Sequence, residues 1–151
     1  MKVLFTDASF DHNSTKRSTE PVVRGKIAVS DGKGFDRVEK VIVGKVPNLQ
    51  QYINILELTA VARAVELACI MELEQKSLAV YTDSQVAMIW ASNGGIKSSV
   101  MTPAHAGALE YLRKMKTAFG GIVTFHHIGR DSNPAGFLLA AELEKESPHT
   151  I

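Results

Sequence analysis

The sequence predicts an α/β fold in which a mixed five-stranded sheet, three antiparallel strands followed by two parallel ones, is flanked by helices. Segments rich in β-branched residues alternate with segments that are apolar at helical spacing, in the order β-β-β-α-β-α-α-β-α. Consecutive strands predict antiparallel neighbours, and strands that follow helices predict parallel crossovers. No repeat or change of composition divides the 151 residues, so we expect a single domain, residues 1–151.

Three strands are predicted at the start of the chain. The first, VLFT over residues 3–6, ends on Asp7, and the polar stretch over residues 8–21 has the Asn, Ser, Thr and Pro content of a long loop. Residues 22–30 and 37–46 are rich in β-branched side chains and are separated by the turn-prone DGKG. They predict two consecutive antiparallel strands.

Helices and strands alternate in the rest of the chain. The patterns predict helices over residues 52–73, 84–92 and 102–119, and strands over residues 78–82 and 122–127. The strand over residues 78–82 is followed directly by Asp83. The last helix has Asn133 as its N-cap and Pro134 at its first position, which is the usual order of these residues at a helix start.

Composition limits the classes of function. Seventeen Lys and Arg residues against sixteen Asp and Glu give a formal charge of +1, so composition alone predicts no nucleic-acid partner. The single cysteine, Cys69, cannot form an internal disulfide. We see no signal sequence and no apolar run near the ~20 residues of a membrane span. We therefore expect a soluble, cytoplasmic protein with no membrane partner.

Glu57 is an acidic residue on the predicted buried face of the first helix. Thr59, Arg63 and Glu66 recur at helical spacing and mark the side predicted to face solvent. Glu57 instead shares a face with apolar side chains at positions i+3, i+4, i+7 and i+11. A buried carboxylate is strongly unfavourable unless a cation or hydrogen-bond donors compensate it. We therefore expect a compensating group beside Glu57.

Asp7, Glu57 and Asp83 form a candidate metal site. If the first and fourth strands are neighbours, their carboxyl ends meet at one edge of the sheet, where ligands bind in open α/β folds. Three carboxylates without a cysteine ligand suit Mg²⁺ or Mn²⁺ and do not suit Zn²⁺. Taken singly, each aspartate has an alternative role as a cap or turn former, and the glutamate as a solvated residue. Their coincidence favours the metal site.

Four segments, LFTDAS, NILELTA, YTDSQ and HIGRDSN, resemble in order the four conserved blocks of type 1 ribonuclease H and the retroviral RNase H domains. The resemblance spans nearly the whole chain. It implies an RNase H-like fold and hydrolysis of the RNA strand of RNA/DNA hybrids by two divalent ions held by Asp7, Glu57 and Asp83. Asn54 matches a hybrid contact. His127 matches a histidine that assists product release, or it is a solvent-facing histidine at a strand end.

Cationic side chains are needed to position a nucleic-acid backbone. Arg130 lies within the fourth matching segment and is a candidate phosphate contact. Other candidates, which have the alternative of being merely solvated, are Lys16, Arg17, Lys97, Arg113, Lys114 and Lys116.

The fourth segment departs from the family pattern at Phe137. His127, Arg130 and Asn133 match the family's spacing before it, and Leu139 matches the spacing after it. The family's fourth carboxylate therefore corresponds to Phe137. The resemblance implies that this carboxylate helps to hold the ion that activates water.

Phe137 leaves several hypotheses open. Asp131, in the predicted loop before the last helix, is the best-placed substitute for the lost carboxylate and His127 is second, while a turn-forming or capping role is the alternative for Asp131. The protein is then a metal-dependent hybrid nuclease of reduced activity or with a Mn²⁺ preference, or a binding module that does not cut hybrids. A third alternative, another nuclease of the same broad fold, is disfavoured by the order of the four segments.

Overall fold

A five-stranded mixed sheet forms the centre of the computed structural model, which describes residues 1–10, 23–43, 49–97 and 101–146. The strands are β1 (Lys2–Phe10), β2 (Val23–Ser30), β3 (Asp36–Val43), β4 (Ser77–Thr82) and β5 (Ile122–His127), in the spatial order β3-β2-β1-β4-β5. Strands β1, β2 and β3 pair antiparallel, whereas β4 pairs parallel with both β1 and β5. The predicted mixed sheet is confirmed.

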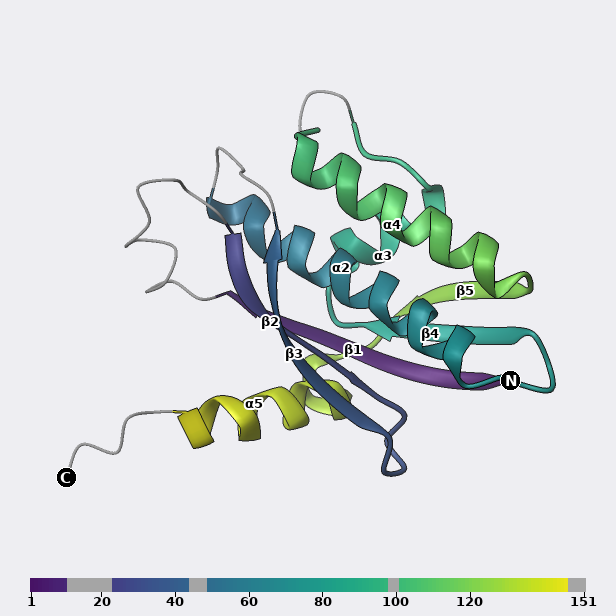
Figure 1. The fold of residues 1–151 in the computed structure, drawn as a ribbon. Helices are drawn as coiled ribbons and strands as arrows, with labels where there is room; N and C mark the ends of the chain where they lie inside the picture. Colours follow the sequence, from purple (N-terminus) through teal and green to yellow (C-terminus); the bar gives the residue numbers. More distant parts are fainter. Residues whose placement is uncertain (11–22, 44–48, 98–100, 147–151) are drawn as a thin grey trace.

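Helices cover both faces of this sheet (Figure 1). Three of them, α2 (Leu49–Ile70), α3 (Gln85–Asn93) and α4 (Pro103–Phe119), lie on one side, and α5 (Pro134–Glu146) lies on the other. A short 3₁₀ helix, η1 (Arg130–Ser132), leads into α5. Within the described ranges, no helix has the length and apolar character needed to cross a membrane.

The larger core lies between the sheet and α2, and α4 packs on α2 from outside. Because α2 is covered on two sides, Thr59, Arg63 and Glu66, on the side predicted to face solvent, are half-buried, so that prediction holds only in part. Arg63 forms an ion pair with Glu39 of β3 at 2.7 Å and another with Glu66, to which the Tyr111 hydroxyl of α4 also donates. These contacts tie β3, α2 and α4 together.

The first strand is longer than its apolar pattern predicts. It continues through Asp7 to Phe10 because β2 pairs alongside it, with Ser9 opposite Lys26 and Phe10 opposite Gly25. Asp7 therefore lies inside β1, and the prediction that the strand ends there is wrong. The rest of the predicted loop, residues 11–21, and the predicted strand end at residues 44–46 lie outside the described residues.

Capping residues mark the ends of α3 and α4. Ser84 caps α3 by accepting a hydrogen bond from the Ala87 N–H at 3.1 Å, and Thr102 caps α4. Gly94 and Gly120 end these helices in the left-handed conformation, with φ of 68° and 70°, which glycine adopts without strain. The helix predicted over residues 52–73 is shifted, since α2 spans Leu49–Ile70.

Gly25 allows α2 to approach the sheet, and we predict that Gly25→Ala destabilises the fold. An added Cβ would lie 2.3 Å from the carbonyl oxygen of Ser9 and 2.7 Å from Cδ1 of Leu56. Overpacking of this kind costs about 1–3 kcal/mol. Urea denaturation measures the free energy of unfolding, with Gly95→Ala as control because nothing lies within 4 Å of its added Cβ. Equal stability of the two variants would contradict the prediction.

Candidate metal centre

The structure brings Asp7, Glu57 and Asp83 together at one edge of the sheet. Strands β1 and β4 are parallel neighbours in which Thr6 lies opposite Thr82, so the residues that follow them, Asp7 and Asp83, lie side by side. Glu57 reaches the same place from α2. One carboxylate oxygen from each residue lies within 4.8 Å of the other two. The predicted convergence of the three acids is therefore present, and we call them the carboxylate cluster.

Side-chain hydrogen bonds hold the backbone on both sides of the cluster. The buried Thr6 hydroxyl donates to the carbonyl of Tyr81 at 3.0 Å, which joins β1 to β4. The buried Thr82 hydroxyl accepts a hydrogen bond from the Ser84 N–H at 3.1 Å and fixes the turn that contains Asp83. The carboxylates therefore start from rigid backbone positions, which favours a preorganised binding site.

The environment of the cluster opposes ionisation of its carboxyl groups. Glu57 is only 4% exposed. Burial, followed by the charges of Asp7 and Asp83, raises the pKa of Glu57 well above its usual value. Burial, followed by the charge of Asp83, raises the pKa of Asp7 to about 6. Like charges held this close need protons or a cation between them.

The donor set of the cluster fits a hard divalent cation. Among the described residues, Oε2 of Glu57 is buried without a hydrogen-bond partner, an arrangement that is unfavourable unless a ligand completes it. Mg²⁺ and Ca²⁺ hold oxygen ligands at roughly 2.0–2.6 Å, so oxygens of one coordination shell lie up to about 4–5 Å apart. The 4.8 Å spread of the cluster matches that size. Its oxygens favour Mg²⁺ or Mn²⁺ over softer metals.

The first turn of α5 lies against this cluster. The buried Asn133 side chain donates to the Thr6 carbonyl at 2.9 Å and accepts from the Ala135 N–H at 3.1 Å. The predicted N-cap role of Asn133 is confirmed. Its bond to Thr6 has no local signal, because the two residues are 127 positions apart. A Cβ added to Gly136 would lie 3.4 Å from Oδ2 of Asp7, so α5 begins in contact with the cluster.

The other predicted site residues lie on β5, η1 and α2. His127 ends β5 opposite Thr82 and is exposed, and Arg130 and Asp131 are exposed in η1. Asn54 is half-buried on α2, three residues before the cluster glutamate. Asp131 is not in the three-carboxylate group. Roles for these four residues in binding or catalysis stay predictions.

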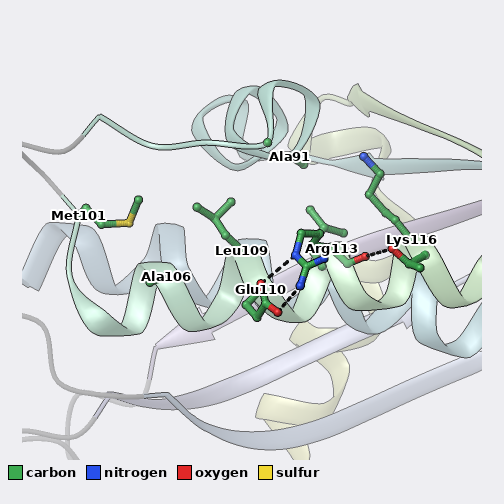
Figure 2. A pocket seen from close by; sticks show the side chains of 10 residues that line it. Ala91, Met101, Ala106, Leu109, Glu110, Arg113 and Lys116 are labelled. Atoms are coloured by element: carbon green, nitrogen blue, oxygen red, sulfur yellow. Dashed lines mark hydrogen bonds and ion pairs between the residues drawn. The ribbon is translucent and has the colours of Figure 1, made fainter.

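A pocket lies between α3 and α4 (Figure 2). Of the predicted site residues, its lining includes only Arg113 and Lys116, two of the candidate cations. Apolar side chains that include Met101 and Leu109 line it. The carboxylate of Glu110 in its wall is paired with Arg113. The pocket therefore offers no second group of free carboxylates, and the cluster beside Asp7 is the better candidate for chemistry.

At the level of sequence, no protein-family model matches the chain and no curated protein is significantly similar to it. Solved structures do resemble it. RNase H1 from Halobacterium salinarum has a TM-score of 0.61 at 16% identity and covers 95% of this chain and 97% of its own. LC11-RNase H1, isolated from compost, has a TM-score of 0.61 at 18% identity, and the match covers 96% of this chain and 98% of that one. The chain has the RNase H fold.

LC11-RNase H1 in complex with an RNA/DNA hybrid is also similar, with a TM-score of 0.55 at 19% identity over 87% of this chain and 88% of that one. At such low identity, likeness to these RNase H structures shows the fold alone. The fold accounts for why β1, α2 and β4 meet at one edge. What the carboxylate cluster does there is argued from its own residues.

Proposed function

We propose that this protein is a metal-dependent endonuclease that hydrolyses the RNA strand of RNA/DNA hybrids. The observation that carries the proposal is the buried, unpartnered Oε2 of Glu57 beside Asp7 and Asp83, since this arrangement calls for a divalent cation. The RNase H fold supports it, as does the hybrid bound by the structurally similar LC11-RNase H1.

In this proposal the carboxylate cluster holds Mg²⁺ or Mn²⁺. When bound, such ions supply activation of a water molecule and stabilisation of the leaving oxygen. Asn54 contacts the hybrid from α2, and recognition of the RNA 2′-hydroxyl in the shallow groove gives selectivity for RNA. The exposed Arg130 binds a phosphate.

Position 137, in the first turn of α5, holds phenylalanine and no carboxylate. Resemblance to type 1 ribonuclease H assigns this position to a fourth acidic residue, and the contact between the start of α5 and Asp7 supports that assignment. We therefore expect slow turnover or a preference for Mn²⁺. His127 assists product release, and the exposed Asp131, in η1 before α5, is the best-placed substitute for the lost acid.

Cleavage of an end-labelled RNA/DNA hybrid tests this function. We expect the wild-type protein to cut the RNA strand in Mg²⁺ or Mn²⁺ and to lose that activity in EDTA. Asp7→Asn, which removes one ligand charge, should lower the rate at least ~100-fold. Loss of a group that only orients a metal ligand already lowers metal affinity or activity by about 10–100-fold. Equal background cleavage by the two proteins would reject the proposal.

A binding module that does not cut is the second candidate, and the apolar residue at position 137 favours it. The same experiment separates the two functions when the affinity for hybrid is measured in parallel. Hybrid binding without turnover in either metal would support the binding module, whereas metal-dependent turnover would dismiss it.

A further inference from the structure

Phe137 exposes an aromatic ring on the first turn of α5. Its side chain is 60% exposed, and among the large exposed apolar residues of the described ranges it is the only aromatic one. An aromatic side chain gains about 1.5–3 kcal/mol when its surface is removed from water. A ring held in water on a rigid helix is therefore well suited to bind a flat, apolar surface.

Phe137 follows directly on the part of α5 that contacts the carboxylate cluster. Asn133 anchors the start of α5 to β1 through the Thr6 carbonyl. The backbone of Gly136 then passes so close to Asp7 that an added Cβ would be 3.4 Å from Oδ2. Phe137 is the next residue, and consecutive Cα atoms are about 3.8 Å apart. A molecule bound across the cluster and along the first turn of α5 is therefore within reach of the Phe137 side chain.

A nucleobase is the flat ligand that the surroundings favour. The exposed Arg130 and the exposed His127 lie in the segments that lead into α5, and both suit the phosphate that accompanies a base. A base stacked on an aromatic side chain contributes about 1–3 kcal/mol to binding. Bases inside an intact duplex already stack on each other, so only an unpaired base has a free face for Phe137.

We propose that Phe137 is a stacking platform for an unpaired base, and that the protein prefers hybrids with an unpaired nucleotide beside the bound phosphate. This inference rests on the proposed function and names its substrate class. It assigns position 137 a role in substrate selection. Phe137 then determines specificity and does not act on the reacting atoms.

Equilibrium binding in EDTA, where no cleavage is expected, tests the proposal. Fluorescence anisotropy compares a fully paired RNA/DNA hybrid with the same hybrid carrying one unpaired purine in the RNA strand. Wild-type protein should bind the second hybrid about 5- to 100-fold more tightly. Phe137→Ala should reduce this ratio to nearly one, and Phe137→Trp should preserve it.

Leu143→Ala is the matched control, because Leu143 is an exposed apolar residue further along the same helix. It should leave the binding ratio unchanged. Equal affinity of the wild-type protein for the two hybrids, or a preference that survives in Phe137→Ala, would overturn the stacking proposal. If the fully paired hybrid is nevertheless cleaved in the presence of Mg²⁺ or Mn²⁺, the proposed function stands without the stacking proposal. Absence of binding to either hybrid, together with absence of cleavage, would overturn both.

Discussion

Glu57→Gln is expected to stabilise the metal-free protein and to abolish its stabilisation by Mn²⁺. In the metal-free wild-type protein, burial and the charges of Asp7 and Asp83 oppose ionisation of Glu57. Glutamine keeps the shape of the side chain without that charge. The amide cannot replace a carboxylate ligand, so metal-dependent cleavage should fall at least ~100-fold, as for Asp7→Asn.

The effect of Glu57→Gln depends on pH. The folded-state pKa values of Glu57 and Asp7 lie above their ordinary values, so folding favours the protonated forms. Their contribution to stability is present at low pH and is lost as pH rises above the ordinary carboxyl range, through about 6 for Asp7 and through the raised pKa of Glu57. The advantage of the variant in EDTA should therefore grow between pH 5 and pH 8, to about 1–3 kcal/mol.

Urea denaturation in EDTA and in Mn²⁺ measures both effects. Mn²⁺ at 100 times its dissociation constant should stabilise the wild-type protein by about 2.7 kcal/mol and the variant hardly at all. Glu66→Gln is the matched control on the same helix. Hydrogen bonding from Tyr111, together with Arg63, lowers the pKa of Glu66, so this variant should lose stability and keep its response to Mn²⁺. Identical Mn²⁺ responses of wild type and Glu57→Gln would remove Glu57 from the metal site.

Asn133→Ala is expected to destabilise the protein by about 2–4 kcal/mol, from the loss of a helix cap and of a buried hydrogen bond. The Asn133 amide caps α5 through the Ala135 N–H and also satisfies the Thr6 carbonyl. Alanine leaves both backbone groups unpaired inside the protein. Since Thr6 precedes Asp7, we also expect weaker Mn²⁺ binding.

Thermal and urea unfolding check this second prediction, and calorimetric titration with Mn²⁺ checks its effect on the cluster. Asn93→Ala is the control, because Asn93 is an exposed asparagine at the end of α3 and is not one of the cluster residues. A loss of stability no greater in Asn133→Ala than in Asn93→Ala would show that the contact with Thr6 contributes little.

Local patterns in the sequence predicted the elements that depend on neighbouring residues. Helical phase placed Glu57 on the buried side of α2, and it is 4% exposed. The predicted N-cap role of Asn133 depends on a side chain that accepts a hydrogen bond from an N–H group two residues away. The strand over residues 122–127 was predicted to the residue, with Gly121 directly before its first residue.

Only the tertiary structure decided features that depend on contacts between distant segments. Pairing with β2 extends β1 beyond Asp7. Arg63 lies on the side of α2 predicted to face solvent, and it is half-buried because β3 and α4 flank that side. The same holds for the contact of Asn133 with Thr6, across 127 positions. Hydrophobic periodicity arises from the geometry of one helix or strand, so a short stretch of sequence is enough to detect it. Register between strands, and the burial that a covering helix imposes, are set by the chain as a whole.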